Sequence, residues 1–132
     1  MKNQFLFFLL CFIAYSTINA AEFQSFKNTR ADSAIISFTK TLHDYGTIKK
    51  GSEGTYDFTF TNTGKIPLIL SNVSTTCGCT TPSWPREPIA PGKSGQIKVK
   101  YNTANIGGFQ KGITVYSNAK TVMLTIKGSV QE

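Results

Sequence analysis

The sequence predicts an all-β protein: an immunoglobulin-like β-sandwich of about seven antiparallel strands, preceded by a cleaved signal peptide. Short runs in which apolar and polar residues alternate are the first observation, since this period of two is typical of half-buried strands. Gly, Pro and Asn separate these runs at roughly 8–12-residue intervals. No amphipathic helical period follows the N-terminal apolar run. The 132 residues are 40% hydrophobic and 16% charged, which is typical of one globular domain.

The N-terminus has the three parts of a secretory signal peptide. Lys2 provides the positive charge, residues 5–15 form the apolar part, and small residues lead to a cleavage site after Ala20, with a cut after Ala21 as the alternative. The apolar part is shorter than the roughly 20 residues that a membrane-spanning helix needs, so we expect no transmembrane segment in the mature chain. Cys11 lies inside the apolar part, which argues against a lipoprotein. The chain therefore divides into a signal peptide (1–20), a flexible spacer (21–33) and an immunoglobulin-like domain (34–132).

Alternation is clearest in residues 55–62, where Tyr56, Phe58 and Phe60 share one face. Asn62 and Gly64 predict a turn after this strand, and Pro91 with Gly92 predicts a type II turn before residues 96–101. The predicted strands are 34–38, 42–48, 55–62, 67–73, 96–101, 109–117 and 122–130. Their inward positions predict a core made of Phe58, Phe60, Ile97, Val99, Ile113, Val115, Leu124 and Ile126.

Cys77 and Cys79 are the only cysteines left once the signal peptide is removed. In an extended strand their Cα atoms would lie roughly 6.6 Å apart, at the upper edge of the disulfide range, and a bend at Gly78 would shorten that distance. An oxidising compartment favours a local disulfide or a pair of packed thiols. Two alternatives remain open: a thiol-redox role, and binding of a soft monovalent ion such as Cu(I).

The segment that follows contains the only tryptophan and several prolines. Proline-rich connections usually fix the path of a loop, and Trp84 would then cap the end of the core. The alternative is an exposed, rigid partner-binding loop formed by Pro82, Trp84, Pro85 and Arg86, because Trp is enriched where proteins bind each other.

No motif in the chain predicts catalysis. His43 and Asp44 are adjacent on a predicted strand, so their side chains point to opposite faces and do not act together. We expect no catalytic residue, no cofactor and no resident metal site. The net charge of +7, which becomes +6 without Lys2, is spread singly along strands and turns. Nucleic-acid-binding modules concentrate such charge, so we expect no nucleic-acid partner.

Several motifs resemble those of one protein family in the same order. They are H-D-Y-G-T-I (43–48), T-N-T-G (61–64), P-L-I-L (67–70), C-G-C-T-T-P-S-W-P (77–85), I-A-P-G-K-S-G (89–95) and V-Y-S-N-A (115–119). The chain resembles the bacterial domain of unknown function 1573 family, related to the Hydin/ASH immunoglobulin-like domains, from about residue 38 to residue 130. The resemblance implies an exported sandwich with no assigned reaction, and its relatives are mostly interaction modules.

These observations favour an exported, periplasmic or extracellular, non-enzymatic module that binds another protein or an envelope component. The alternative function is that of a small envelope protein that binds a soft metal ion or exchanges thiols through Cys77 and Cys79.

When the full chain is expressed in a Gram-negative host, we expect the exported protein to begin at Ala21, because signal peptidase cleaves after small residues. Intact-mass measurement of the periplasmic fraction checks this. A chain that keeps residues 1–20, or one that carries lipid on Cys11, would contradict the assignment.

Overall fold

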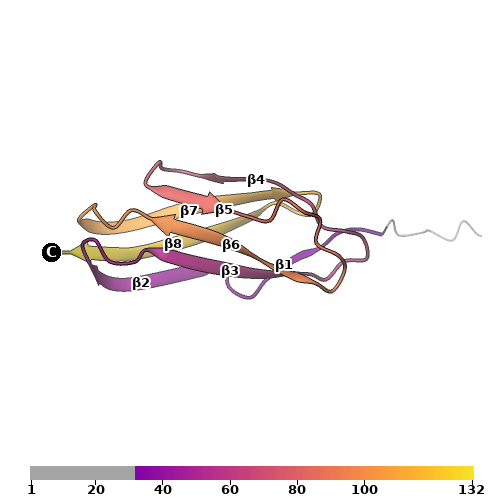
Figure 1. The fold of residues 1–132 in the computed structure, drawn as a ribbon, viewed down its shortest axis with the longest axis horizontal. Helices are drawn as coiled ribbons and strands as arrows, with labels where there is room; N and C mark the ends of the chain where they lie inside the picture. Colours follow the sequence, from indigo (N-terminus) through magenta and orange to yellow (C-terminus); the bar gives the residue numbers. More distant parts are fainter. Residues whose placement is uncertain (1–31) are drawn as a thin grey trace, which may run out of the picture. The chain divides into compact units, whose positions relative to one another are not determined.

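The computed structural model describes residues 32–132 of the chain. The predicted signal peptide and the spacer up to residue 31 lie outside these residues. The described part contains eight strands and no helix (Figure 1). No helix within 32–132 is therefore long and apolar enough to cross a membrane. The strands are β1 (Ile36–Phe38), β2 (Leu42–Lys49), β3 (Thr55–Asn62), β4 (Leu70–Thr75), β5 (Thr80–Ser83), β6 (Ser94–Tyr101), β7 (Gly107–Ser117) and β8 (Val122–Gln131).

Two four-stranded sheets form the sandwich, which confirms the predicted fold class. One sheet has the order β1-β3-β6-β5 and the other has the order β2-β8-β7-β4. The chain changes sheets at every connection except β5 to β6 and β7 to β8. The sandwich has two flanks (Figure 1). At one flank the edge strands β4 and β5 lie beside each other, and at the other β2 contacts β3 of the facing sheet.

The strand predicted at 67–73 lies at 70–75 as β4, and the structure differs from the sequence prediction in two further details. β5 lies in the proline-containing segment that was expected to be a loop. Pro82 is tolerated there because β5 is an edge strand, where one side of the backbone needs no hydrogen-bond donor. The second difference is that β2 pairs with β8 in parallel, whereas all other pairs are antiparallel. The crossing from β1 places β2 beside the last strand of the chain, and both then run in the same direction.

The core lies between the two sheets and contains every residue predicted for it. Phe60, Ile97, Val99, Ile113, Val115, Leu124 and Ile126 have no exposed surface, and Phe58 is 1% exposed. Leu68 and Val130 complete the interior. Each large apolar side chain buried in this way contributes about 1.5–3 kcal/mol, so the sandwich does not depend on a covalent link between its sheets.

Asn62, the last residue of β3, is the one fully buried polar side chain of this interior. Its amide nitrogen donates to the carbonyls of Ile66 (2.8 Å) and Ile89 (2.9 Å). Its amide oxygen accepts the N–H groups of Gly64 (2.9 Å) and Ile35 (3.4 Å). Asn62 therefore replaces the hydrogen bonds that four backbone groups would otherwise make with water.

The backbone of Asn62 binds the predicted type II turn. Its N–H donates to the carbonyl of Lys93 (2.9 Å), and its carbonyl accepts the N–H of Gly92 (2.7 Å). Gly92 has a φ of 78°, which confirms the positive value expected for this turn. Gly64 is required for a different reason: a Cβ there would lie 2.2 Å from the carbonyl oxygen of Ser33. One residue thus joins the segment before β1, the turn after β3 and the connection before β6.

Replacing Asn62 with Ala should lower the free energy of unfolding by about 2–4 kcal/mol, because buried backbone groups would lose their partners. The matched control is Asn72→Ala, which makes the same change at an exposed position of β4 and should stay within about 0.5 kcal/mol of the parent. Urea denaturation of both variants measures the difference. Equal effects would show that the buried hydrogen bonds of Asn62 do not stabilise the domain.

Candidate functional site

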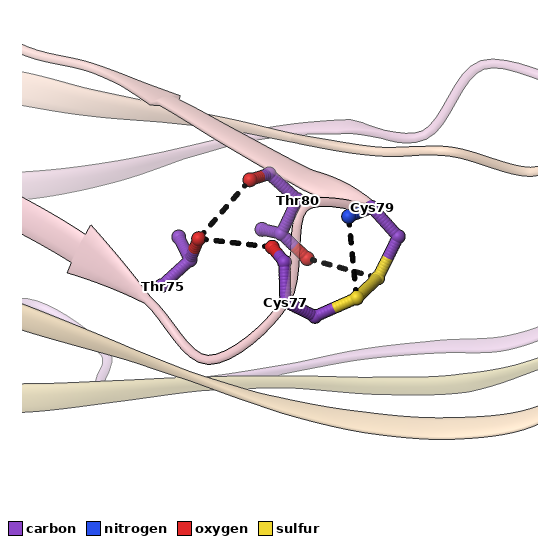
Figure 2. The surroundings of a disulfide bond; sticks show 4 residues. All are labelled: Thr75, Cys77, Cys79 and Thr80. Atoms are coloured by element: carbon purple, nitrogen blue, oxygen red, sulfur yellow. Dashed lines mark hydrogen bonds between the residues drawn. A yellow bond between two sulfur atoms is a disulfide. The ribbon is translucent and has the colours of Figure 1, made fainter.

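Cys77, Gly78 and Cys79 form the turn by which the chain crosses from β4 to β5. The two sulfur atoms are bonded to each other, and the Cα atoms lie 5.3 Å apart, closer than in an extended strand. The hydroxyl of Thr75 donates to the carbonyls of Cys77 (3.0 Å) and Thr80 (3.2 Å), as Figure 2 shows. The N–H of Thr80 also donates to the carbonyl of Cys77 (3.3 Å). Hydrogen bonds therefore hold the turn in addition to the disulfide.

The surroundings of the two sulfur atoms differ. The N–H of Cys79 donates to the sulfur of Cys77 at 3.2 Å (Figure 2). The hydroxyl of Thr80 lies 3.9 Å from the sulfur of Cys79, which receives no backbone N–H from the described residues. Both cysteines are half-buried and Gly78 is exposed, so solvent and other molecules reach the turn.

A cleft of about 530 Å³ opens beside this turn. Three segments line it: the turn between β2 and β3, the cysteine turn, and the end of β6 with the residues after it. Lys100 and Glu53 are its charged residues, and Cys79 is the cysteine that lines it. The lining residues are Gly51, Ser52, Glu53, Gly54, Gly78, Cys79, Thr81, Lys100, Tyr101, Asn102 and Thr103.

Hydrogen bonds between the three segments fix the walls of the cleft. The N–H of Asn102 donates to the carbonyl of Cys79 (2.8 Å), which joins the cysteine turn to the end of β6. The hydroxyl of Thr103 donates to the carbonyl of Ser52 (2.7 Å), and the N–H of Tyr101 donates to the carbonyl of Gly54 (2.9 Å). The cleft is therefore present in the folded chain and does not need a ligand to form it.

Tyr45 supports the same wall from the other sheet. Its hydroxyl donates to the carbonyl of Gly54 (2.7 Å). Burial, with a smaller effect from Glu53, raises the pKa of Tyr45 to about 12, so this phenol stays protonated at any physiological pH. The pKa of the Glu53 carboxyl is lowered, mainly because it accepts a hydrogen bond from the hydroxyl of Thr55 and also because Lys100 lies near. No motif in the sequence predicts either contact: the first joins a residue of β2 to the turn that follows it, and the second joins that turn to the start of β3.

His43 and Asp44 point to opposite faces of β2 in the structure. The imidazole of His43 stacks on the ring of Tyr56, with centroids 3.6 Å apart, and its partial burial lowers its pKa. The carboxylate of Asp44 accepts the N–H of Gly46 (2.8 Å) and lies 3.9 Å from the amine of Lys127. The aromatic stack closes the flank between β2 and β3, and neither residue contacts the cysteine turn or its cleft.

Trp84 packs against the core at the other flank, directly after β5. Its ring is half-buried, and the guanidinium of Arg86 lies 3.9 Å above it. The indole N–H is buried without a hydrogen-bond partner among the described residues. Pro82 lies within β5, and Pro85 follows Trp84 as a half-buried residue. The four residues of the predicted binding loop therefore lie along one flank, with only Arg86 of the four exposed.

A family model for a protein of unknown function, DUF1573, matches residues 36–130. The chain belongs to the DUF1573 family. This match covers the whole sandwich, including the cysteine turn, the cleft and the Trp84 flank. It confirms the family that the motifs predicted, and the family description assigns no reaction. No curated protein is significantly similar to this DUF1573 chain.

Solved structures share the fold at low sequence identity. A protein of unknown function from Porphyromonas gingivalis W83 is 21% identical with a TM-score of 0.66, and the match covers 76% of this chain and 49% of that one. This chain thus spans about half of that protein. The ASH/PapD-like domain 7 of human CEP192 is 10% identical with a TM-score of 0.64, with 76% and 87% covered. The YadV chaperone is 14% identical with a TM-score of 0.52, with 76% and 53% covered.

Within residues 32–132, no three His, Cys, Asp or Glu side chains gather in a group that could hold a metal ion. Binding of a soft ion by Cys77 and Cys79 would first require reduction of their disulfide, since the thiolate is the ligand form of cysteine.

Proposed function

We propose that this DUF1573 chain is an exported, non-enzymatic module that binds another protein or an envelope component through the outer edge of β2. A sheet edge binds an extended segment by continuing the sheet, with main-chain hydrogen bonds supplying affinity. The observation that supports the proposal is the contrast between β2 and the three other edge strands of the sandwich.

β1 and β5 offer little to a partner strand. β1 has three residues, so it presents a very short edge. In β5, Pro82 has no N–H to donate, and the N–H of Thr80 already donates to the carbonyl of Cys77. The carbonyl of Thr80 accepts the hydroxyl of Thr75. Proline and satisfied backbone groups are features that prevent an edge from pairing with another chain.

The outer edge of β4 is covered by a later segment of the chain, which is hydrogen-bonded near both ends of the strand. Before β4, Leu68 and Ile89 exchange two backbone hydrogen bonds of 2.8 Å. After it, the hydroxyl of Thr75 holds Cys77 and Thr80. The segment from β5 to residue 89 therefore lies along the outer side of β4, and Trp84 packs against the core between the two ends.

β2 spans eight residues, and no described segment pairs with its outer edge. A register shift between Asp44 and Thr47 divides the strand into two regular pieces. The N–H of Lys50 donates to the carbonyl of Gln131, on the β8 side. Because strand residues alternate in direction, Thr47 and Lys49 direct their backbone groups away from β8. Lys40, Lys49 and Lys50 are exposed around this edge and outnumber Asp44, so an extended segment with acidic side chains fits it best.

The comparisons fit protein binding without naming a partner. The YadV neighbour is a chaperone, and CEP192 contributes a PapD-like domain. At 14% and 10% identity these proteins share the fold, and binding by this chain rests on its own edge.

A photoreactive amino acid at Thr47 should cross-link to the partner in cells of the source organism. The matched controls are the same residue at Ser37, on the exposed edge strand β1, and at Arg86, in the predicted binding loop. We expect one partner adduct from position 47 and none from 37 or 86, with thermal melts showing that all three variants are folded. An adduct from position 86 alone would overturn the edge assignment in favour of the loop of Pro82, Trp84, Pro85 and Arg86.

A further inference from the structure

We propose that the Cys77–Cys79 disulfide is a thiol–disulfide exchange site, and that the cleft beside it admits a peptide segment carrying two thiols. The proposal is independent of binding at β2, because the cleft and that edge are formed by different residues. Its evidence is the position of the disulfide, the asymmetry of the two sulfur atoms and the charge on the cleft wall.

The disulfide lies where a substrate can reach it. Cys79 lines a cleft of about 530 Å³, a volume within the range of sites that bind small ligands or a few peptide residues. This disulfide joins residues two apart in the turn between β4 and β5, where both cysteines are half-buried and Gly78 is exposed, and it does not link the two sheets through the core. The link therefore adds little to the connection between the sheets.

The hydrogen bonds of the turn determine which of the two sulfur atoms a substrate thiolate attacks. When the bond opens, one sulfur becomes a thiolate, and an N–H donor stabilises negative charge on the sulfur that it faces. The N–H of Cys79 faces the sulfur of Cys77 at 3.2 Å, so Cys77 is the better leaving group. The attacking thiolate therefore approaches Cys79, the cysteine that lines the cleft.

The reaction has two steps that balance. A substrate thiolate attacks the sulfur of Cys79, the Cys77–Cys79 bond breaks, and its electron pair leaves on Cys77 as a thiolate. The second substrate thiolate then attacks the substrate sulfur of this mixed disulfide and releases Cys79 as a thiolate. The substrate dithiol is oxidised to a disulfide, and the protein disulfide is reduced to two thiols.

The cleft wall assists the approach of the substrate. Lys100 pairs with Thr81 in the sheet and lines the cleft, where its amine attracts a thiolate. Glu53 on the facing turn offsets part of this charge. Thr75 and Thr80 hold the turn by hydrogen bonds to the carbonyl of Cys77, so the turn keeps its place when the disulfide opens.

The test uses the purified oxidised chain and a synthetic peptide with two cysteines. We expect one equivalent of peptide disulfide per domain, measured by mass spectrometry. A peptide with one cysteine, quenched with a maleimide, should be found on Cys79 with the maleimide on Cys77. The oxidised peptide of residues 75–81 is the control for the same cysteines without a cleft, and it should react at both sulfurs.

Lys100→Gln should slow the exchange about threefold at low salt, because one attractive charge is lost from the cleft. The matched control is Lys98→Gln, which removes a lysine two residues along the same face of β6 that does not line the cleft. It should leave the rate unchanged. Absence of peptide oxidation, attachment at Cys77, or equal behaviour of the domain and the 75–81 peptide would each overturn the proposal.

Discussion

The buried amide of Asn62 is the contact on which the order of the whole sandwich depends. Apolar packing draws the two sheets together, but it does not by itself fix where the loops between strands lie. Asn62 does so because its side chain and backbone make six hydrogen bonds, four of which reach segments that are distant in sequence. An incorrect arrangement of these loops would leave polar groups unpaired in the interior, which is costly.

The two ends of the sandwich have different properties as a result. β6 runs from the end closed by Asn62, where Ser94 pairs with Thr61, to the cleft end, where Lys100 pairs with Thr55. The closed end carries the turn at Gly92 and has its polar groups satisfied internally. The cleft end carries the cysteine turn, with a half-buried disulfide and an accessible wall. Because the fold is held by the core and the closed end, the disulfide is available for chemistry.

Sequence patterns predict those parts of the structure that depend on neighbouring residues. The alternation of Phe58 and Ile97 with polar residues identified the core, and Pro91 with Gly92 identified a turn. Contacts between distant segments have no such signal. Asn62 was expected only to form a turn, and its burial depends on Ile89, which is far along the chain. Proline predicts a loop at residue 82. Pro82 lies instead in the edge strand β5, because this segment pairs with β6, and that pairing cannot be read from neighbouring residues. The cleft likewise unites three turns whose residues are unremarkable in the sequence.

The free energy of unfolding with and without the disulfide tests most directly the claim that packing and Asn62, and not the sulfur bridge, maintain the domain. It is measured by urea denaturation of the oxidised chain and of the Cys77→Ser/Cys79→Ser variant. A link between residues two apart restricts the unfolded chain little, so the account predicts a loss of at most about 1.5 kcal/mol and a variant that remains folded. A variant that fails to fold, or that loses as much as Asn62→Ala, would contradict it.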